Sequence, residues 1–242
     1  MRVPASLHAT VRRWGRHLLT PAQFGAVGRL AAYPFRGNLT MLAAIYGSDK
    51  TNRHAYTEHY QRHLSHLRRQ PVRVLEIGIG GYDTPQGGAS LRMWRSYFRH
   101  ADVHGLDLHF KAISEPGITA HQGDQSDPEV LRRLGDAHGP FDIVIDDGSH
   151  INRHIRASFG VLFPDYLKPG GWYVIEDMAT AYLDDFGGGA VGTPETSVEL
   201  VKDLVDDVNR TFWEAGGGGG HHPLAVKSIH VYEQIAFIAK SG

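Results

Sequence analysis

The stretch VRVLEIGIG (72–80) sets the pattern that decides the fold. Its apolar residues are enough for one buried strand, and the run ends in Gly78 and Gly80. From this point the sequence alternates between short apolar runs and segments whose apolar residues have helical spacing. Alternation of strands and helices predicts a parallel sheet that is covered by helices on both faces.

Five strands and four helices are predicted in this way, followed by a hairpin. The strands are VRVLEIGIG (72–80), VHGLDL (103–108), ITAHQGD (118–124), FDIVIDD (141–147) and WYVIED (172–177), the last after a turn at 168–171. The helices cover 89–99, 128–138 with Asp127 as N-cap, 154–167 and about 195–214. The tail, 224–241, predicts two antiparallel strands at the sheet edge. The expected fold is α/β, with a doubly wound, mostly parallel, seven-stranded sheet.

The length of the chain limits its domain organisation. A chain of 242 residues suits one α/β domain with an appendage better than two full domains. Residues 1–70 precede the first strand and are expected to form a helical N-terminal extension or lid, and residues 71–242 the sheet domain.

Composition argues against several classes of partner. With 25 basic and 26 acidic residues there is no reason to expect a nucleic-acid partner, and the lack of cysteine excludes disulfides and thiolate chemistry. No apolar run approaches the ~18–20 residues that a membrane span needs. Arg12-Arg13 is not followed by an uninterrupted apolar segment, so an export signal is not expected and the predicted location is cytoplasmic.

The first 48 residues contain several arginines and no acidic residue. A basic amphipathic segment can lie on a membrane surface. A contact within a homodimer or larger homo-oligomer, or a cap over the active site, is the commoner use of such a segment, and we favour these.

Polar residues at the ends of the first three strands indicate a ligand site. Glycines at the turn EIGIGG (76–81) let the backbone approach a ligand at a helix N-terminus. A dinucleotide fingerprint would place glycine or alanine at position 83, where Asp83 stands, and this counts against NAD. Asp107 ends the second strand, where a carboxylate can accept hydrogen bonds from a ribose. Asp124 and Gln125 follow the third strand.

The next two strands carry the residues that suggest chemistry. FDIVIDDGSH ends in Asp146, Asp147 and His150, and WYVIED ends in Glu176 and Asp177. Neighbouring parallel strands lie ~4.8 Å apart, so these carboxylates can converge, and they then need a cation. Oxygen ligands favour Mg²⁺, and we select Asp147, Glu176 and Asp177 as its ligands. Asp146 is expected to face the cofactor or to cap the turn, as Asp residues often do.

These residues, taken together, resemble a known family. Glu76-x-Gly78-x-Gly80, Asp107 and Asp124 resemble the class I S-adenosylmethionine (SAM)-dependent methyltransferases. GSDKTNRHAYTEHYQRHL (47–64), GGASLRMWRSYF (87–98), IDDGSH and VIEDM (174–178) more narrowly resemble the metal-dependent sugar O-methyltransferases of the macrocin and mycinamicin type and related actinobacterial enzymes of glycolipids and polysaccharides. The resemblance covers roughly residues 40–180. It implies the Rossmann-like SAM methyltransferase fold.

The resemblance also implies roles for individual residues. SAM would be the cofactor, S-adenosylhomocysteine (SAH) the product and Mg²⁺ the metal. Glu76, Gly78 and Gly80 would line the methionine and ribose, Asp107 would hold the ribose, Asp124 and Gln125 would lie near the adenine, and Ser90 could contact the cofactor's carboxylate. Tyr56 and Tyr60 would belong to a lid over the cofactor, with simple packing against the sheet an equal alternative.

The expected reaction is methyl transfer to a sugar hydroxyl of a glycoside, oligosaccharide or polysaccharide. His150, three residues after Asp147, would act as the general base for that hydroxyl. Two enzymatic alternatives are an O-methyltransferase of phenols or catechols and an NAD-dependent oxidoreductase; a binding protein without catalysis is the third.

Other features are weaker candidates for function. His154 could line the substrate cleft, and His54 and His59 flank the possible lid. The pair His221-His222 follows the glycine run 216–220, which we interpret as a flexible loop rather than a metal site. The glycine-rich segment 184–196 is either a mobile loop over the acceptor or a surface connection.

Overall fold

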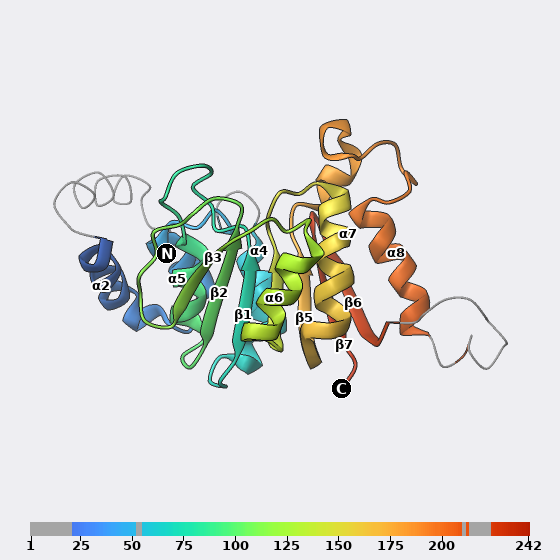
Figure 1. Cartoon of the computed structure of the whole chain (residues 1–242). Helices are drawn as coiled ribbons and strands as arrows, with labels where there is room; N and C mark the ends of the chain where they lie inside the picture. Colours follow the sequence, from blue (N-terminus) through green and yellow to red (C-terminus); the bar gives the residue numbers. More distant parts are fainter. Residues whose placement is uncertain (1–20, 52–54, 210–211, 213–223) are drawn as a thin grey trace.

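The computed structural model describes residues 21–51, 55–209, 212 and 224–242 (Figure 1). Within these residues seven strands form one sheet, in the order β3-β2-β1-β4-β5-β7-β6. The strands are β1 (Arg73–Ile77), β2 (Asp102–Asp107), β3 (Ile118–Gln122), β4 (Phe141–Asp146), β5 (Leu167–Ile175), β6 (Val226–Tyr232) and β7 (Ile235–Lys240).

Strands β1 to β5 are parallel to one another. Val74 of β1 lies opposite Val103 of β2 and Ile143 of β4, and the pairings β2–β3 and β4–β5 are also parallel. β7 runs antiparallel between β5 and β6. The carboxyl ends of five strands therefore share one edge of the sheet, where open α/β folds bind ligands. The predicted fold class is confirmed.

Helices cover both faces of the sheet, as the alternation of strands and helices predicted. One face carries α3 (Leu39–Tyr46), α4 (Tyr56–Leu64) and α5 (Ala89–Tyr97), with α2 (Pro21–Ala32) against α3. The opposite face carries α6 (Pro128–His138), α7 (Asn152–Val161) and α8 (Ser197–Val208) (Figure 1). Short helical turns lie at Tyr33–Phe35 (η1), Ser65–Leu67 (η2), Leu162–Tyr166 (η3), Met178–Tyr182 (η4) and Asp184–Phe186 (η5).

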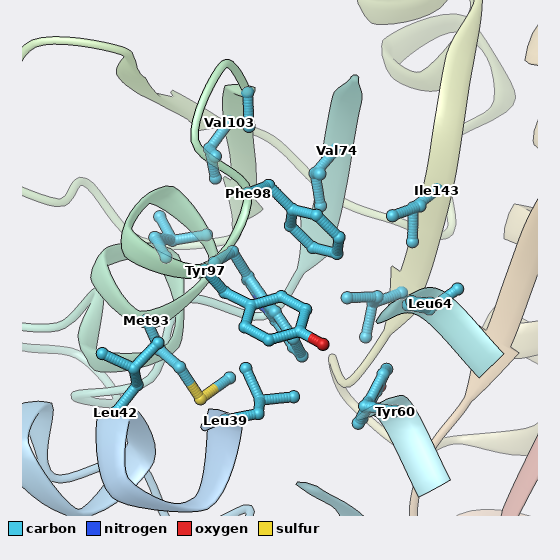
Figure 2. Close-up of a cluster of buried hydrophobic side chains, with 14 of the residues drawn as sticks. Leu39, Leu42, Tyr60, Leu64, Val74, Met93, Tyr97, Phe98, Val103 and Ile143 are labelled. Atoms are coloured by element: carbon cyan, nitrogen blue, oxygen red, sulfur yellow. The ribbon is translucent and has the colours of Figure 1, made fainter. Parts of the chain in front are cut away.

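Two hydrophobic clusters, one on each face, hold the helices to the sheet. On the α3–α5 face, Tyr60, Leu64, Tyr97 and Phe98 pack over Val74 (Figure 2). The opposite cluster joins α6, α7 and α8 to the other side of the same strands. Burial of each large apolar side chain contributes about 1.5–3 kcal/mol, so these clusters fix the strand ends that carry the site.

The boundaries of several elements agree with the sequence. Helix 128–138 is confirmed, and the Asp127 side chain caps it by accepting a hydrogen bond from the Glu129 amide. The C-terminal hairpin is also confirmed, since β6 and β7 pair antiparallel.

Three boundaries were wrong. β5 begins at Leu167, and the predicted turn 168–171 lies inside it as a bulge, because Phe141 pairs with Leu167 while Ile143 pairs with Trp172. α7 begins at Asn152 and gives way at Leu162 to a wider π-helical turn. α8 ends at Val208, where Asn209 forms its C-cap, rather than near 214.

In the part of the chain that the structure describes, no helix combines the length and the apolar character that crossing a bilayer requires. The basic segment 1–20, His54, the glycine run and His221-His222 lie outside the described residues. The proposed division at residue 70 stays a prediction; α3 and α4 share one core with α5 and the sheet.

Candidate active site

A cleft of about 900 Å³ opens at the carboxyl ends of the parallel strands. Its walls come from the segments that follow β1, β2, β3, β4 and β5, together with Gly47–Asp49 after α3. Gly78 makes this convergence possible, because a Cβ at that position would lie 2.0 Å from the carbonyl oxygen of Asp147. Its φ of +89° is also one that glycine adopts readily and other residues rarely do. The end of β1 can therefore lie directly against the segment after β4.

Most of the predicted cofactor residues line this cleft. They are Gly78, Gly80, Ser90, Asp107, Asp124 and Gln125. The carboxylate of Asp107 is held in place because it accepts hydrogen bonds from the amides of Ile79, at 3.0 Å, and His109, at 2.9 Å. A Cβ at Gly80 would meet no atom within 4 Å, so the wall is open at this point.

Two predicted cofactor acids lie behind the cleft rather than in its wall. Glu76 is fully buried and accepts a hydrogen bond from the Ser90 hydroxyl at 2.7 Å. Asp146 is 1% exposed and accepts hydrogen bonds from Ser158, from Tyr173 at 3.2 Å and from Gln125 at 3.1 Å. Burial raises the pKa of both carboxyl groups. Asp146 lies on the side of β4 that packs against α7, and its contact with the cofactor stays a prediction.

Tyr56 and Tyr60 are likewise buried, within the cluster beneath α4. The hydroxyl of Tyr56 donates to Oδ1 of Asp177 at 2.7 Å, and that of Tyr60 donates to Oε1 of Glu176. Neither lines the cleft, and both hydroxyls contact the acids at the end of β5; their part in a lid over the cofactor stays a prediction.

Three of the residues predicted for catalysis or metal binding meet at the floor of the cleft. Nε2 of His150 lies 3.6 Å from Oδ2 of Asp177 and 4.0 Å from Oδ1 of Asp147. One nitrogen or oxygen atom from each lies within 4.8 Å of the others. His150 and Asp177 both have left-handed backbones, with φ of 56° and 54°. Such a backbone costs about 1–2 kcal/mol in a non-glycine residue, and observed strain of this kind is common at functional sites.

Glu176 is linked to Asp147 by a residue that the sequence analysis missed. Nζ of Lys50 donates to Oε1 of Glu176 at 2.7 Å and to Oδ2 of Asp147 at 2.6 Å, and lies 3.2 Å from Oε1 of Glu76. Lys50 is 1% exposed and Glu176 2% exposed. The lysine therefore neutralises a buried cage of acids directly behind the cleft.

The charges in this cage stabilise one another. Burial lowers the pKa of Lys50, but attraction to Asp147 and Glu176 outweighs it and holds that pKa well above its ordinary value. Burial and the neighbouring Asp147 raise the pKa of Glu176. Lys50 consequently stays charged at neutral pH and fixes the position of Asp147.

The sequence does contain a signal for Lys50. It is the only lysine among the first 110 residues, in which every other strongly basic side chain is arginine. Lysine is a compact point charge, which suits a small cage of carboxylates better than the planar guanidinium does.

A second missed residue is Asn152, at the start of α7. Its amide nitrogen donates to the carbonyls of Thr180, at 3.2 Å, and Phe186, at 3.0 Å, while its oxygen accepts from the amide of Ser197 at 2.7 Å. One buried side chain thus fastens both ends of the glycine-rich segment 184–196 next to the His150 turn.

The donor atoms on the cleft floor fit a divalent cation. Asp147 and Asp177 offer oxygen atoms to the cleft, which is the ligand chemistry that Mg²⁺ prefers, and Glu176 lies beside them through Lys50. The cleft above them, with the fixed Asp107 carboxylate and the open wall at Gly80, fits a nucleoside-containing cofactor such as SAM.

Comparison with known proteins supports the same kind of site. No family model matches the chain. It is 45% identical over 240 residues, 95% of its length, to the mycinamicin VI 2''-O-methyltransferase of Micromonospora griseorubida. It is 49% identical over 193 residues, 77% of its length, to the demethylmacrocin O-methyltransferase of Streptomyces fradiae. The chain therefore belongs to the family of sugar O-methyltransferases of the macrocin and mycinamicin type, and the resemblance found in the sequence is confirmed.

A solved structure of a relative is also similar. MycE methyltransferase in complex with Mg and SAH superimposes with a TM-score of 0.80 at 46% identity, covering 84% of this chain and 53% of that one. A second structure of MycE, with Mg, SAH and mycinamycin VI, gives a TM-score of 0.78. The chain spans 59% and 49% of the length of the two curated relatives named above.

Proposed function

We propose that this chain is a SAM-dependent, Mg²⁺-dependent O-methyltransferase that acts on a sugar hydroxyl of a glycosylated natural product. The observation that carries the proposal is the meeting of Asp147, His150 and Asp177 at the floor of a cleft whose upper wall carries the predicted cofactor residues. The name of another relative supports the substrate class: the chain is 44% identical over 227 residues to the 8-demethyl-8-alpha-L-rhamnosyl tetracenomycin-C 2'-O-methyltransferase of Streptomyces olivaceus, whose name specifies a rhamnosyl group.

Different residues would bind the cofactor and hold the metal. Asp107, Asp124 and Gln125 line the part of the cleft assigned to the ribose and adenine of SAM. Asp147 and Asp177, with Glu176 beside them, would hold Mg²⁺, which when bound acidifies and orients an acceptor hydroxyl. Lys50 fixes Asp147 and Glu176 from behind.

His150 is the proposed base. Its Nε2 lies 3.6 Å from Oδ2 of Asp177 and 4.0 Å from Oδ1 of Asp147, so the ring is next to the carboxylates that would hold the metal and its acceptor hydroxyl. As the methyl group passes from sulfur to that oxygen, the S–CH₃ bond breaks and the proton moves to Nε2. The chain needs no acid for the leaving group, because the sulfonium of SAM becomes the neutral thioether of SAH.

The decisive experiment follows methyl transfer from labelled SAM to matched acceptors. The panel contains glycosylated macrolides and other glycosides, their aglycones, oligosaccharides and simple catechols, each with Mg²⁺ and with a chelator. We expect Mg²⁺-dependent turnover of glycosides but not of aglycones. Turnover of catechols alone would replace this proposal with the phenolic alternative, and binding of NAD in place of SAH would exclude both. A cytoplasmic location and a homodimer remain predictions.

A further inference from the structure

Three histidines meet at a place that the proposed reaction does not use. His104 on β2, His121 on β3 and His138 at the end of α6 each offer one ring nitrogen, and the three nitrogens lie within 4.8 Å of one another. Nδ1 of His104 and Nε2 of His121 are 3.1 Å apart. The rings of His104 and His121 each lie 4.7 Å, between centroids, from the ring of His138.

The topology of the sheet brings these residues together. His104 and Leu106 lie on the same face of β2, and Leu106 is directly opposite His121 of β3. Side chains two residues apart on a strand share a face, so both imidazoles point to the side that α6 covers. His138 is in the last turn of α6 and completes the group. His104 is the third residue of β2 and His121 the fourth of the five residues of β3, and none of the three histidines lines the cleft.

We propose that His104, His121 and His138 form a second metal site, which binds Zn²⁺ or a similar transition-metal ion and joins β2, the edge strand β3 and α6. Two nitrogens on one tetrahedral Zn²⁺, at about 2.0–2.1 Å each, lie roughly 3.4 Å apart. The observed 3.1 Å is within a few tenths of an ångström of that separation. This pair of nitrogens therefore has nearly the spacing that one ion requires, and a ring nitrogen of His138 lies within 4.8 Å of one from each of the other two.

The ligand type separates this site from the one in the cleft. Imidazole nitrogen suits zinc, copper and nickel, whereas carboxylate oxygen suits magnesium. His121 and His138 are partly exposed, so an ion can reach them, and a fourth position remains for water.

The surroundings of His104 support its role as a ligand. Oδ2 of Asp102 lies 3.2 Å from Nε2 of His104, so a carboxylate stands on the side of the ring that faces away from His121. A metal-bound histidine commonly donates its other ring N–H to such a carboxylate, which fixes the ring and its tautomer.

A metal ion at this site would restrain the edge strand of the sheet. β3 is the last strand on its side and leads directly into Asp124 and Gln125, which line the cofactor cleft. An ion held by β2, β3 and α6 would stabilise the folded state and restrict that strand, since a ligand of the native state alone raises stability.

The test uses the full-length chain without a polyhistidine tag, freed of metals with a chelator that is then removed. In excess Mg²⁺, which occupies oxygen ligands, the protein is titrated with Co²⁺ while the visible absorption is recorded, and Zn²⁺ is then added as competitor. We expect one tight equivalent of Co²⁺ with the absorption of a nitrogen-ligated, four-coordinate ion, displacement by Zn²⁺, and a higher melting temperature with Zn²⁺.

Variants decide whether the histidine cluster is responsible. His121→Gln and His138→Gln should each weaken binding by more than about 100-fold, because loss of an outer partner alone costs roughly 10–100-fold. Asp102→Asn should fall within that smaller range. Two controls, the exposed His100→Gln and the cleft variant Asp147→Asn, should bind as the parent does.

Circular dichroism and SAH binding show that each variant is folded. His121→Gln and His138→Gln change different residues, so each tests the proposal separately. The proposal is overturned if the parent binds no equivalent of Co²⁺ or Zn²⁺, if His121→Gln and His138→Gln bind like the parent, or if Asp147→Asn alone abolishes binding.

Discussion

Nζ of Lys50 lies 2.6 Å from Oδ2 of Asp147, although the two residues are 97 positions apart in the sequence. The same nitrogen also contacts Glu176 and Glu76. The side chains of Lys50, Glu176 and Glu76 are each no more than 2% exposed. A buried cation with several acidic partners makes the stability of this region depend on one residue.

Replacing Lys50 with Met should therefore be strongly destabilising. The acids would remain buried without a counter-charge, and breaking a buried pair from one side costs about 3–5 kcal/mol. Lys202→Met is the matched control, because it removes a solvent-exposed lysine that pairs with Glu199 on α8, and such surface pairs contribute little to stability. Urea denaturation measures the free energy of unfolding of both variants. Added Mg²⁺ should restore part of the stability that Lys50→Met loses. Equal stability of the two variants would show that the cage does not depend on the lysine.

His150 offers a clean test of the base. Its left-handed backbone is one that Asn also adopts, so His150→Asn removes the imidazole with little change in conformation. Turnover should fall by roughly 10²–10⁴-fold, the usual contribution of a general base, while the affinity for SAH stays the same. His154→Asn, which changes a second histidine of the cleft wall, should have a much smaller effect. Full activity of His150→Asn in a steady-state assay would disprove the assignment.

Asp177 can be changed without disturbing its neighbour. In Asp177→Asn the new side-chain oxygen can still accept the hydrogen bond from Tyr56, but one negative charge is lost from the cleft floor. We expect activity to require a higher Mg²⁺ concentration, with a smaller change at saturating metal. Mg²⁺ titrations of initial rate compare it with Asp185→Asn, an exposed acid that does not line the cleft. If the parent is fully active in chelator, the metal assignment fails.

The fold was predictable because its signals are local. The alternation of apolar runs fixes the order of strands and helices, and the N-cap Asp127 marks the start of α6. The bulge in β5 was missed because a KPGG sequence is typical of a turn, whereas here pairing with β4 continues on both sides of it. Long-range pairing, which no local pattern encodes, decided that case.

The site was predictable in part for the same reason. Asp147, His150 and Asp177 follow strand ends, and strand ends in a parallel sheet converge. Adjacent residues on a strand point to opposite faces, so the pair Asp146-Asp147 was ambiguous until its register was known. Lys50 has partners 97 and 126 positions away, and its importance arises only when the chain folds.

Asn152 should control the order of the glycine-rich segment 184–196. Asn152→Ala removes two donated hydrogen bonds and one accepted bond, and leaves buried carbonyls at Thr180 and Phe186 without this partner. The expected loss of stability is about 1–3 kcal/mol, with faster hydrogen exchange across 178–197. The matched control is the exposed Asn209→Ala. Unchanged exchange in that segment would show that Asn152 does not anchor it.

The last prediction concerns acid sensitivity and His63 of α4. Its ring contacts His230 and Phe237, with centroids 4.4 and 4.7 Å away, and its Nε2 lies 2.9 Å from the Tyr232 hydroxyl. Burial, and then the nearby His230, Arg62 and His59, lower its pKa from 6.5 to about 4. Between about pH 4 and pH 6.5, His63 is therefore mostly neutral in the folded state, whereas it is mostly protonated in the unfolded chain.

A lowered histidine pKa means that the stabilising effect is complete above the unfolded value of 6.5 and is lost as the pH falls from there toward about 4. His63→Gln should thus lose less stability than the parent between about pH 7 and pH 5, whatever its stability at neutral pH. His66→Gln, which changes an exposed histidine three residues away, should keep the parental slope. Free energies of unfolding from urea titrations across this range give the slopes. A parental slope in His63→Gln would assign the acid sensitivity to other groups.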